Sequence, residues 1–176
     1  MKLTALMNTL QLPDTFMAFH LRLGDVRHSK NTVDRDSSRK FSKINALLST
    51  HGSGMPILLM SDRKDGAIIE MLKSKYKQIQ FTEDFIDHLK ESDLRREFPE
   101  INDFRVLEFL LQKFICERNT VFVGYHFSTV SHHIQYMNFI NGKNSQLYID
   151  GITKFNQNNY DWVTENVYGA SIACLL

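Results

Sequence analysis

The chain has 176 residues, of which 43% are hydrophobic, 11% are aromatic and 23% are charged. A chain of this length and composition buries about two-thirds of the surface that its unfolded form exposes, which excludes disordered and fibrous proteins. Its 21 Lys and Arg residues nearly balance its 20 Asp and Glu residues, and the formal net charge of +1 excludes a global field that would draw the chain to nucleic acid or to an anionic membrane.

Short apolar runs alternate along the chain with longer segments of helical spacing. The run FMAFHL at residues 16–21 is almost entirely apolar, as is typical of a parallel strand covered on both faces. In the clearest helix, apolar residues from Phe104 to Ile115 recur at three- and four-residue spacing. Either Asn102 or Asp103 can cap it. In chain order, we predict a helix at 2–11, a strand at 16–21, a helix at 38–49, a strand at 56–60, a helix at 65–75, a strand at 78–81, a helix from 104 onward, a strand at 120–124, a helix at 128–139 and a strand at 146–149.

Long polar stretches connect some of these elements. The polar, charged stretch VRHSKNTVDRDSSRK at 26–40 leads into the predicted helix at 38–49. Residues 81–100 mix acidic and basic side chains, which is typical of a surface connection with room for one helical turn. Residues 151–176 are predicted to form a C-terminal tail packed on the domain. The sequence therefore predicts a single domain over residues 1–176 with an α/β fold: a three-layer, Rossmann-like parallel sheet with helices on both faces.

Cysteine usage and the absence of long apolar runs bear on location. Cys116 lies in the apolar run FLLQKFICE, where we expect a small buried hydrophobic side chain rather than half of a disulfide. The N-terminal residues lack the apolar stretch of a secretory signal, and no run reaches the about 18 apolar residues that a membrane-spanning helix needs. We therefore expect a cytoplasmic protein with no membrane span.

The loop after the first predicted strand is the first of three candidate binding loops. In an open parallel sheet, ligands bind beyond the carboxyl ends of the strands. His20 lies near the end of this strand, and Arg22 lies just past it, with a planar guanidinium that matches two phosphate oxygens. Gly24 would let a ligand approach the backbone closely. The alternative is an ion pair between Arg22 and Asp25 beside a buried histidine.

The loops after two further strands add an acid and several hydroxyls. Ser61 and Asp62 follow the second buried strand, where an acid often contacts a ribose, although Asp62 could equally cap the next helix. Ser128, Thr129 and Ser131 surround the start of a later helix, whose unpaired N–H groups form an anion site. At least one of these hydroxyls is expected to cap that helix. Together the loops would hold a nucleoside diphosphate, although no Gly-x-Gly-x-x-Gly or Walker motif occurs.

The histidines near the last of these loops could suggest a metal site. His132 and His133 are neighbours on the predicted helix and point about 100° apart, so they lack the spacing that places two imidazoles on one metal ion. His126 precedes the helix. We therefore interpret these histidines as structural or solvent-facing and predict no metal site.

The three loops coincide with a series of motifs of known enzymes. The segments HLRLGD at 20–25, LLMSD at 58–62 and VFVGYHFSTVSHHI at 121–134 resemble, in this order, the motifs of the superfamily that contains the protein O-fucosyltransferases and the α1,6- and α1,2-fucosyltransferases. In that superfamily the motifs lie on the C-terminal, GDP-fucose-binding half of a GT-B fold. The resemblance implies an inverting, metal-independent glycosyltransferase that needs no cofactor and transfers fucose from GDP-fucose to a glycan or protein acceptor.

The resemblance also implies roles for individual residues. Arg22 would be catalytic, because it would contact the β-phosphate and stabilise the departing diphosphate, while His20 would line the same pocket. Asp62 would face the guanine or the ribose. The remaining residues of the predicted substrate-binding set are Gly24, Asp25, Ser61, Phe127, Ser128, Thr129 and Ser131.

The sequence departs from the pattern of the superfamily at two places. Val130 stands within the family's Ser-Thr-Phe-Ser segment, and residues 136–138 read Tyr-Met-Asn where an Arg-Gly pair is usual. The motifs span residues 16–140, so we expect the acceptor-binding half and its catalytic base elsewhere, or a homo-oligomer that covers the exposed face. The alternatives are a non-catalytic module that binds a nucleoside diphosphate or a partner, as a truncated remnant or one part of a split enzyme, and a structural α/β domain whose likeness is accidental.

Overall fold

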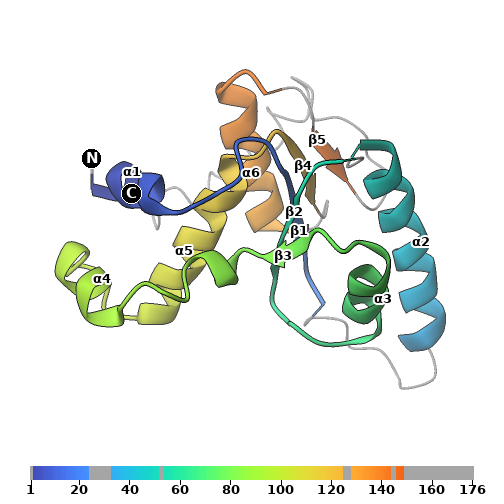
Figure 1. The fold of residues 1–176 in the computed structure, drawn as a ribbon, viewed down its shortest axis with the longest axis horizontal. Coiled ribbons are helices and arrows are strands. Elements are labelled where there is room, and N and C mark those ends of the chain that lie inside the picture. Colours follow the sequence, from blue (N-terminus) through green and yellow to red (C-terminus); the bar gives the residue numbers. More distant parts are fainter. Residues whose placement is uncertain (1, 24–32, 52–53, 125–127, 144–145, 149–176) are drawn as a thin grey trace.

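A five-stranded parallel sheet forms the centre of the structure, a computed structural model (Figure 1). The strands lie in the order β3-β2-β1-β4-β5. They are β1 Met17–Leu21, β2 Ile57–Ser61, β3 Ile79–Phe81, β4 Val121–Gly124 and β5 Gln146–Tyr148. The residues that the structure describes are 2–23, 33–51, 54–124, 128–143 and 146–148.

Helices cover both faces of this sheet. Figure 1 shows α2 and α3 on one side of the strands and α1, α5 and α6 on the other. The helices are α1 Lys2–Thr9, α2 Val33–His51, α3 Ala67–Lys75, α4 Glu91–Glu97, α5 Phe104–Glu117 and α6 Thr129–Ile140, with a 3-10 turn η1 at Glu83–Phe85. The predicted three-layer, Rossmann-like α/β fold is thus confirmed.

Two apolar clusters hold the layers together. Alternate residues of a strand point to opposite faces, so Ala18 and Phe122 pack in a cluster with α1, α5 and α6. Phe19 and Val123 pack in the other cluster, with α2 and α3. All five residues of β1 are buried, as predicted for a strand covered on both faces. His20 shares the side of Ala18, which directs its imidazole toward the face that carries α5 and α6.

The clearest predicted helix is confirmed as α5. Asp103 is its N-cap, and its carboxylate Oδ1 accepts a hydrogen bond from the N–H of Arg105 at 2.9 Å. Cys116, near the end of α5, is fully buried, as predicted, and burial raises the pKa of its thiol. Among the described residues, no helix is both long enough and apolar enough to cross a membrane.

The structure corrects the predicted elements in two places. Helix α2 begins at Val33 rather than at residue 38, because the residues from 34 to 40 are all polar and give no apolar repeat that would predict a helix. The connection at 81–100 holds a complete helix, α4, rather than one turn. Leu94 is the buried residue of α4, and acidic residues in the first turn and basic residues in the last turn complement the helix dipole. The predicted tail at 151–176 lies outside the described residues.

Candidate functional site

The candidate site lies where the strand order changes direction. The connections from β1 lead outward to β2 and β3, whereas β4 and β5 lie on the opposite side of β1. In such sheets ligands commonly bind beyond the carboxyl ends of the two strands at this point, here β1 and β4. His20 is the next-to-last residue of β1, Arg22 is the first residue after it, and Gly124 ends β4. The described ends of β1 and β4, from which two of the three predicted loops start, therefore lie side by side at this edge, and Ser61 and Asp62 after β2 lie next to them.

A buried hydrogen bond joins β1 to α6. The His20 Nδ1 atom lies 2.7 Å from Ser131 Oγ, and both residues are buried. Burial lowers the pKa of His20 to about 4, although the nearby carboxylate of Asp62 acts in the opposite direction. The imidazole is therefore neutral at pH 7. It contributes hydrogen bonding to the site without adding a charge.

A second hydrogen bond joins the loops after β1 and β2. The Leu23 N–H donates to Asp62 Oδ1 at 2.8 Å. Ser61 Oγ, one residue earlier, accepts a hydrogen bond from the N–H of Arg63 at 3.3 Å. The alternative that Asp62 caps the following helix is wrong, because α3 begins at Ala67 with Gly66 as its N-cap and no side-chain cap bond.

The start of α6 carries the three predicted hydroxyls in three different settings. Ser128 is the N-cap and accepts a hydrogen bond from the N–H of Ser131 at 3.5 Å, which confirms that one of them caps the helix. The Ser131 hydroxyl contacts His20. Thr129 is exposed in the first turn of α6. The backbone N–H groups of a first turn have no carbonyl partner within the helix. An anion at this end of the helix would meet these N–H groups and the Thr129 hydroxyl.

Gly124 allows α6 to lie close to the end of β4. A Cβ atom at this position would lie 2.7 Å from the Ser131 hydroxyl oxygen and 2.7 Å from a ring carbon of Phe122. Both distances are shorter than side chains tolerate, so a larger residue would push the helix away from the strand. The sequence contains this glycine at the strand end, but its role depends on a helix approach that the sequence does not reveal.

The structure brings together some of the predicted residues and leaves others undescribed. Seven of the predicted site residues lie at the carboxyl-end edge of the sheet: His20, Arg22, Ser61, Asp62, Ser128, Thr129 and Ser131. Gly24, Asp25 and Phe127 lie outside the described residues, and so does the alternative ion pair between Arg22 and Asp25. Sequence reasoning missed the backbone N–H of Leu23 as the partner of Asp62, because no residue type marks a backbone donor.

The histidines on α6 have packing roles. His132 is buried, and His133 Nε2 lies 3.5 Å from the Glu117 carboxylate, so this contact joins α6 to α5. Glu117 also pairs with Lys113 at 2.9 Å. Burial lowers the pKa of His133 to about 4, with Lys113 acting in the same direction. His126 lies outside the described residues.

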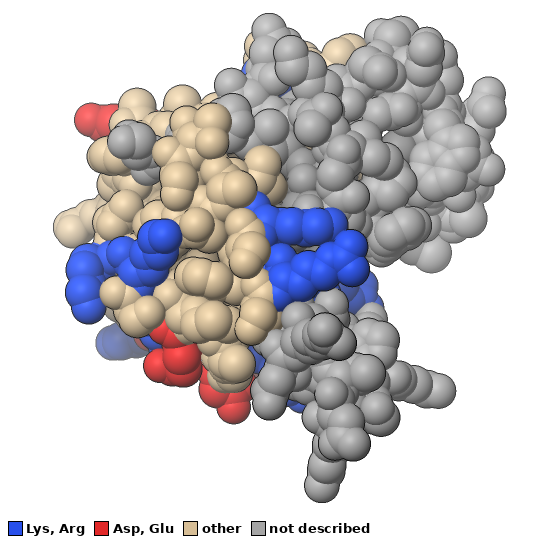
Figure 2. Space-filling view, turned by 90° about the vertical axis from the view of Figure 1, so that its right-hand side faces the viewer, with Lys and Arg blue, Asp and Glu red and all other residues tan. Residues whose placement is uncertain are grey.

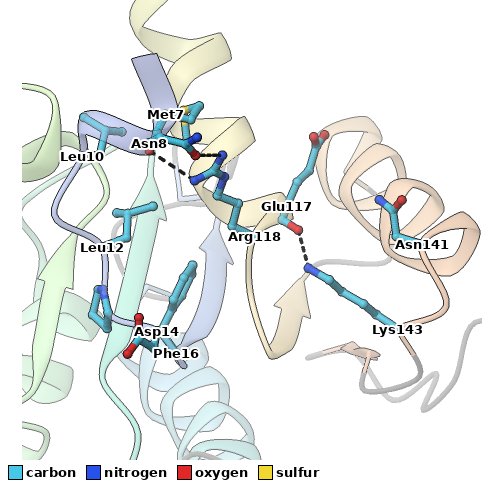
Figure 3. Close-up of a pocket in the computed structure, with 11 residues that line it drawn as sticks. Met7, Asn8, Leu10, Leu12, Asp14, Phe16, Glu117, Arg118, Asn141 and Lys143 are labelled. Carbon is cyan, nitrogen blue, oxygen red and sulfur yellow. Dashed lines mark hydrogen bonds between the residues drawn. The ribbon is translucent and has the colours of Figure 1, made fainter. Parts of the chain in front are cut away.

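A pocket of about 610 Å³ lies at the opposite edge of the sheet, where β1 and β4 begin (Figure 3). Its two basic residues both bind carbonyl groups. Arg118 donates to the carbonyl of Met7 at 3.2 Å, and Lys143 Nζ donates to those of Glu117 and Asn119 at 2.6 and 2.9 Å. These bonds satisfy the C-terminal ends of α1 and α5, so the pocket is explained as a structural junction.

On the α2 side, the basic side chains of the described residues lie in separate patches. Figure 2 shows this face, where uncharged surface separates these patches of Lys and Arg and acidic groups lie at the lower left and the upper left. This pattern agrees with the formal net charge of +1. The groups suited to an anion that the sequence singles out, Arg22 and the start of α6, lie at the carboxyl-end edge of the sheet.

In comparisons with known proteins, neither the protein-family models nor the curated proteins match this chain.

Proposed function

We propose that this domain binds GDP-fucose at the carboxyl ends of β1, β2 and β4 and serves as the donor-binding domain of a fucosyltransferase-like glycosyltransferase. The observation that carries the proposal is the direct contact between the three motif-bearing segments. His20 of the first segment contacts Ser131 of the third, and Leu23 of the first contacts Asp62 of the second. Motifs that are far apart in the sequence thus share one edge of the sheet.

Donor binding would use the positive groups at this edge. Arg22 is exposed just past β1, and its guanidinium can bind two oxygens of the β-phosphate. The start of α6 would add its backbone N–H groups and the Thr129 hydroxyl. Backbone N–H groups of a helix are fixed before the ligand arrives, which makes them effective in stabilising charge.

These groups would assist the transfer step. The bond between the anomeric carbon of fucose and the β-phosphate oxygen breaks, and its electron pair stays on that oxygen. An acceptor hydroxyl forms the new bond from the opposite face, and its proton passes to a base. Arg22 would stabilise the negative charge that grows on the leaving oxygen. The step is complete without a redox partner.

A second candidate function is donor binding without turnover. Among the described residues of the site, Asp62 already accepts a hydrogen bond from Leu23. The pKa of His20 is lowered to about 4, which makes it a weak base at pH 7. His20 is therefore poorly suited to take the acceptor proton, and Asp62 already holds the backbone of Leu23. This favours a module that holds the nucleotide and leaves the base to another domain or chain.

A thermal-shift panel tests the proposal and its alternatives. Binding to the native state raises the melting temperature, so GDP, GDP-fucose, GDP-mannose, UDP and ADP can be compared directly. We expect a shift with the guanine nucleotides only. Hydrolysis or transfer of GDP-fucose would then indicate an enzyme, and binding alone a module. No shift with any nucleotide would support a structural domain and contradict the proposal.

A further inference from the structure

Arg22 lies between two residues that are anchored from outside β1. On one side, a hydrogen bond of 2.7 Å joins His20 Nδ1 to the hydroxyl of Ser131 in α6. On the other side, the backbone N–H of Leu23 donates a hydrogen bond to the carboxylate of Asp62 at 2.8 Å. The two anchors come from different elements, since Asp62 follows β2 and Ser131 follows β4.

The bond to Asp62 continues the pairing of β1 with β2 beyond its last backbone step. The parallel register of these strands ends with Leu21 opposite Ser61. Beyond this pair, the N–H of Leu23 donates a hydrogen bond to the side-chain oxygen of Asp62, which takes the place of a backbone carbonyl of β2. The side chain of Leu23 also packs against the cluster with α2 and α3. The backbone is therefore held at Leu23, directly after Arg22, as well as at His20 before it.

The bond to Ser131 is fixed by packing. Ser131 is fully buried, and Gly124 lets α6 lie against the end of β4 so closely that any added Cβ would touch it. His20 is buried with 6% of its surface exposed. Neither partner can move without disturbing the sheet and the helix, so the position of His20 is tied to that of α6.

We infer that Asp62 and Ser131 are positioning residues, which hold the backbone on both sides of Arg22 and thereby set where its guanidinium meets a diphosphate. This inference rests on the proposed function, which supplies the diphosphate. It differs from the sequence-based expectation that both residues contact the nucleotide directly. A shift of about 1 Å in such a group is enough to lower binding or catalysis strongly.

Amide hydrogen exchange tests the anchoring without any ligand. In Asp62→Ala, we expect the Leu23 amide to exchange about tenfold faster or more, because it loses a charge-assisted hydrogen bond. Asp62→Asn keeps an acceptor oxygen and should restore most of the protection. Asp65→Ala, an exposed acid in the same loop, is the matched control and should leave Leu23 unchanged. Unchanged exchange in Asp62→Ala would overturn the inference.

Binding of GDP and GMP tests whether the anchors act through Arg22. Only GDP carries the β-phosphate, so Asp62→Ala should weaken GDP binding about tenfold and change GMP binding little. In the Arg22→Ala background, adding Asp62→Ala should have no further effect. Direct contact of Asp62 with the base or ribose would weaken GMP equally and give additive losses, which would overturn the inference. Ser131→Ala should behave in the same way, and the exposed Asp62 keeps the test decisive if that buried variant does not fold.

Hydrogen exchange and nucleotide binding together distinguish a failure of this inference from a failure of the proposed function. If the unmodified protein binds neither nucleotide, the proposed function fails, and so does the diphosphate role assigned to the anchors. Faster exchange of Leu23 in Asp62→Ala would still support the anchoring itself. If the protein binds GDP but the variants leave its affinity unchanged, the proposed function stands and the positioning role fails.

Discussion

The imidazole of His20 and the hydroxyl of Ser131 lie 2.7 Å apart, although 111 residues separate them in the chain. The contact is buried and joins the end of the central strand to the first turn of α6. It places the first and third sequence motifs against each other at the edge where ligands bind in sheets of this kind.

Replacing Arg22 is expected to affect the binding of diphosphates most. Arg22→Ala should weaken GDP binding by roughly 10- to 100-fold, the effect of losing charged hydrogen bonds to phosphate. Isothermal titration measures this directly. Arg96→Ala removes an equal charge from α4, where the side chain is 72% exposed, and should not change the affinity. Equal affinities of Arg22→Ala and the unmodified protein would contradict the proposed function.

Replacing Gly124 is expected to separate α6 from β4. The new methyl group of Gly124→Ala would lie 2.7 Å from the Ser131 hydroxyl, and overpacking of this kind lowers the free energy of unfolding by about 1–3 kcal/mol. Urea unfolding measures the loss. Lys77→Ala, an exposed residue between α3 and β3, is the control and should leave stability unchanged. A Gly124→Ala protein as stable as the control would mean that α6 is free to move.

Acid is expected to destabilise the protein through its buried histidine. The pKa of His20 is about 4 in the folded protein against 6.5 in the unfolded chain, so the unfolded state binds the proton more readily. The contribution of His20 is complete above pH 6.5, is lost as the pH falls toward 4, and amounts to about 3 kcal/mol at most. His133 acts in the same direction.

The difference between the unmodified protein and His20→Gln isolates this contribution from other titrating groups. We expect the stability difference between the two proteins, measured by urea unfolding, to shrink as the pH is lowered from 7.5 to 4.5. A difference that is constant over this range would show that His20 takes up its proton equally well in both states. His133→Gln serves as the comparison at the interface of α5 and α6.

Replacing Lys143 is expected to affect stability but not nucleotide binding. Its ammonium group donates to two carbonyls at the end of α5, so Lys143→Ala should cost about 1–3 kcal/mol by leaving them unsatisfied. The site beyond the carboxyl ends of the strands lies at the other edge of the sheet. GDP affinity, measured below the melting temperature, should therefore stay unchanged. Reduced affinity in a folded Lys143→Ala protein would link the pocket to the site.

The sequence predicts the parts of this fold that depend on apolar pattern. The strand at Met17–Leu21 and the helix after Asp103 follow from runs of buried residues and a cap. The apolar pattern does not predict the first turn of α2 or the whole of α4, because their sequences are rich in charged residues and lack an apolar repeat. In α4, one buried residue, Leu94, packs the helix on the rest of the protein.

The candidate site is predictable only as a set of loops. Strand ends identify the positions of Arg22, Asp62 and Ser128, because a parallel sheet gathers its carboxyl ends at one edge. The hydrogen-bond partner of each side chain, by contrast, cannot be predicted from the strand ends. Asp62 binds a backbone N–H rather than capping a helix, since the geometry of the strand end, which residue types do not encode, decides between the two.

The position of β1 at the centre of the sheet has a consequence for the order in which the protein is assembled. Met17 pairs with Ile57 on one side and with Val121 on the other. During synthesis, β1 and β2 can meet early, but the second edge of β1 has no strand to pair with until the chain has been made past β4. An unpaired edge of this kind invites pairing with other chains. The candidate site is then completed by α6, one of the last described elements to leave the ribosome.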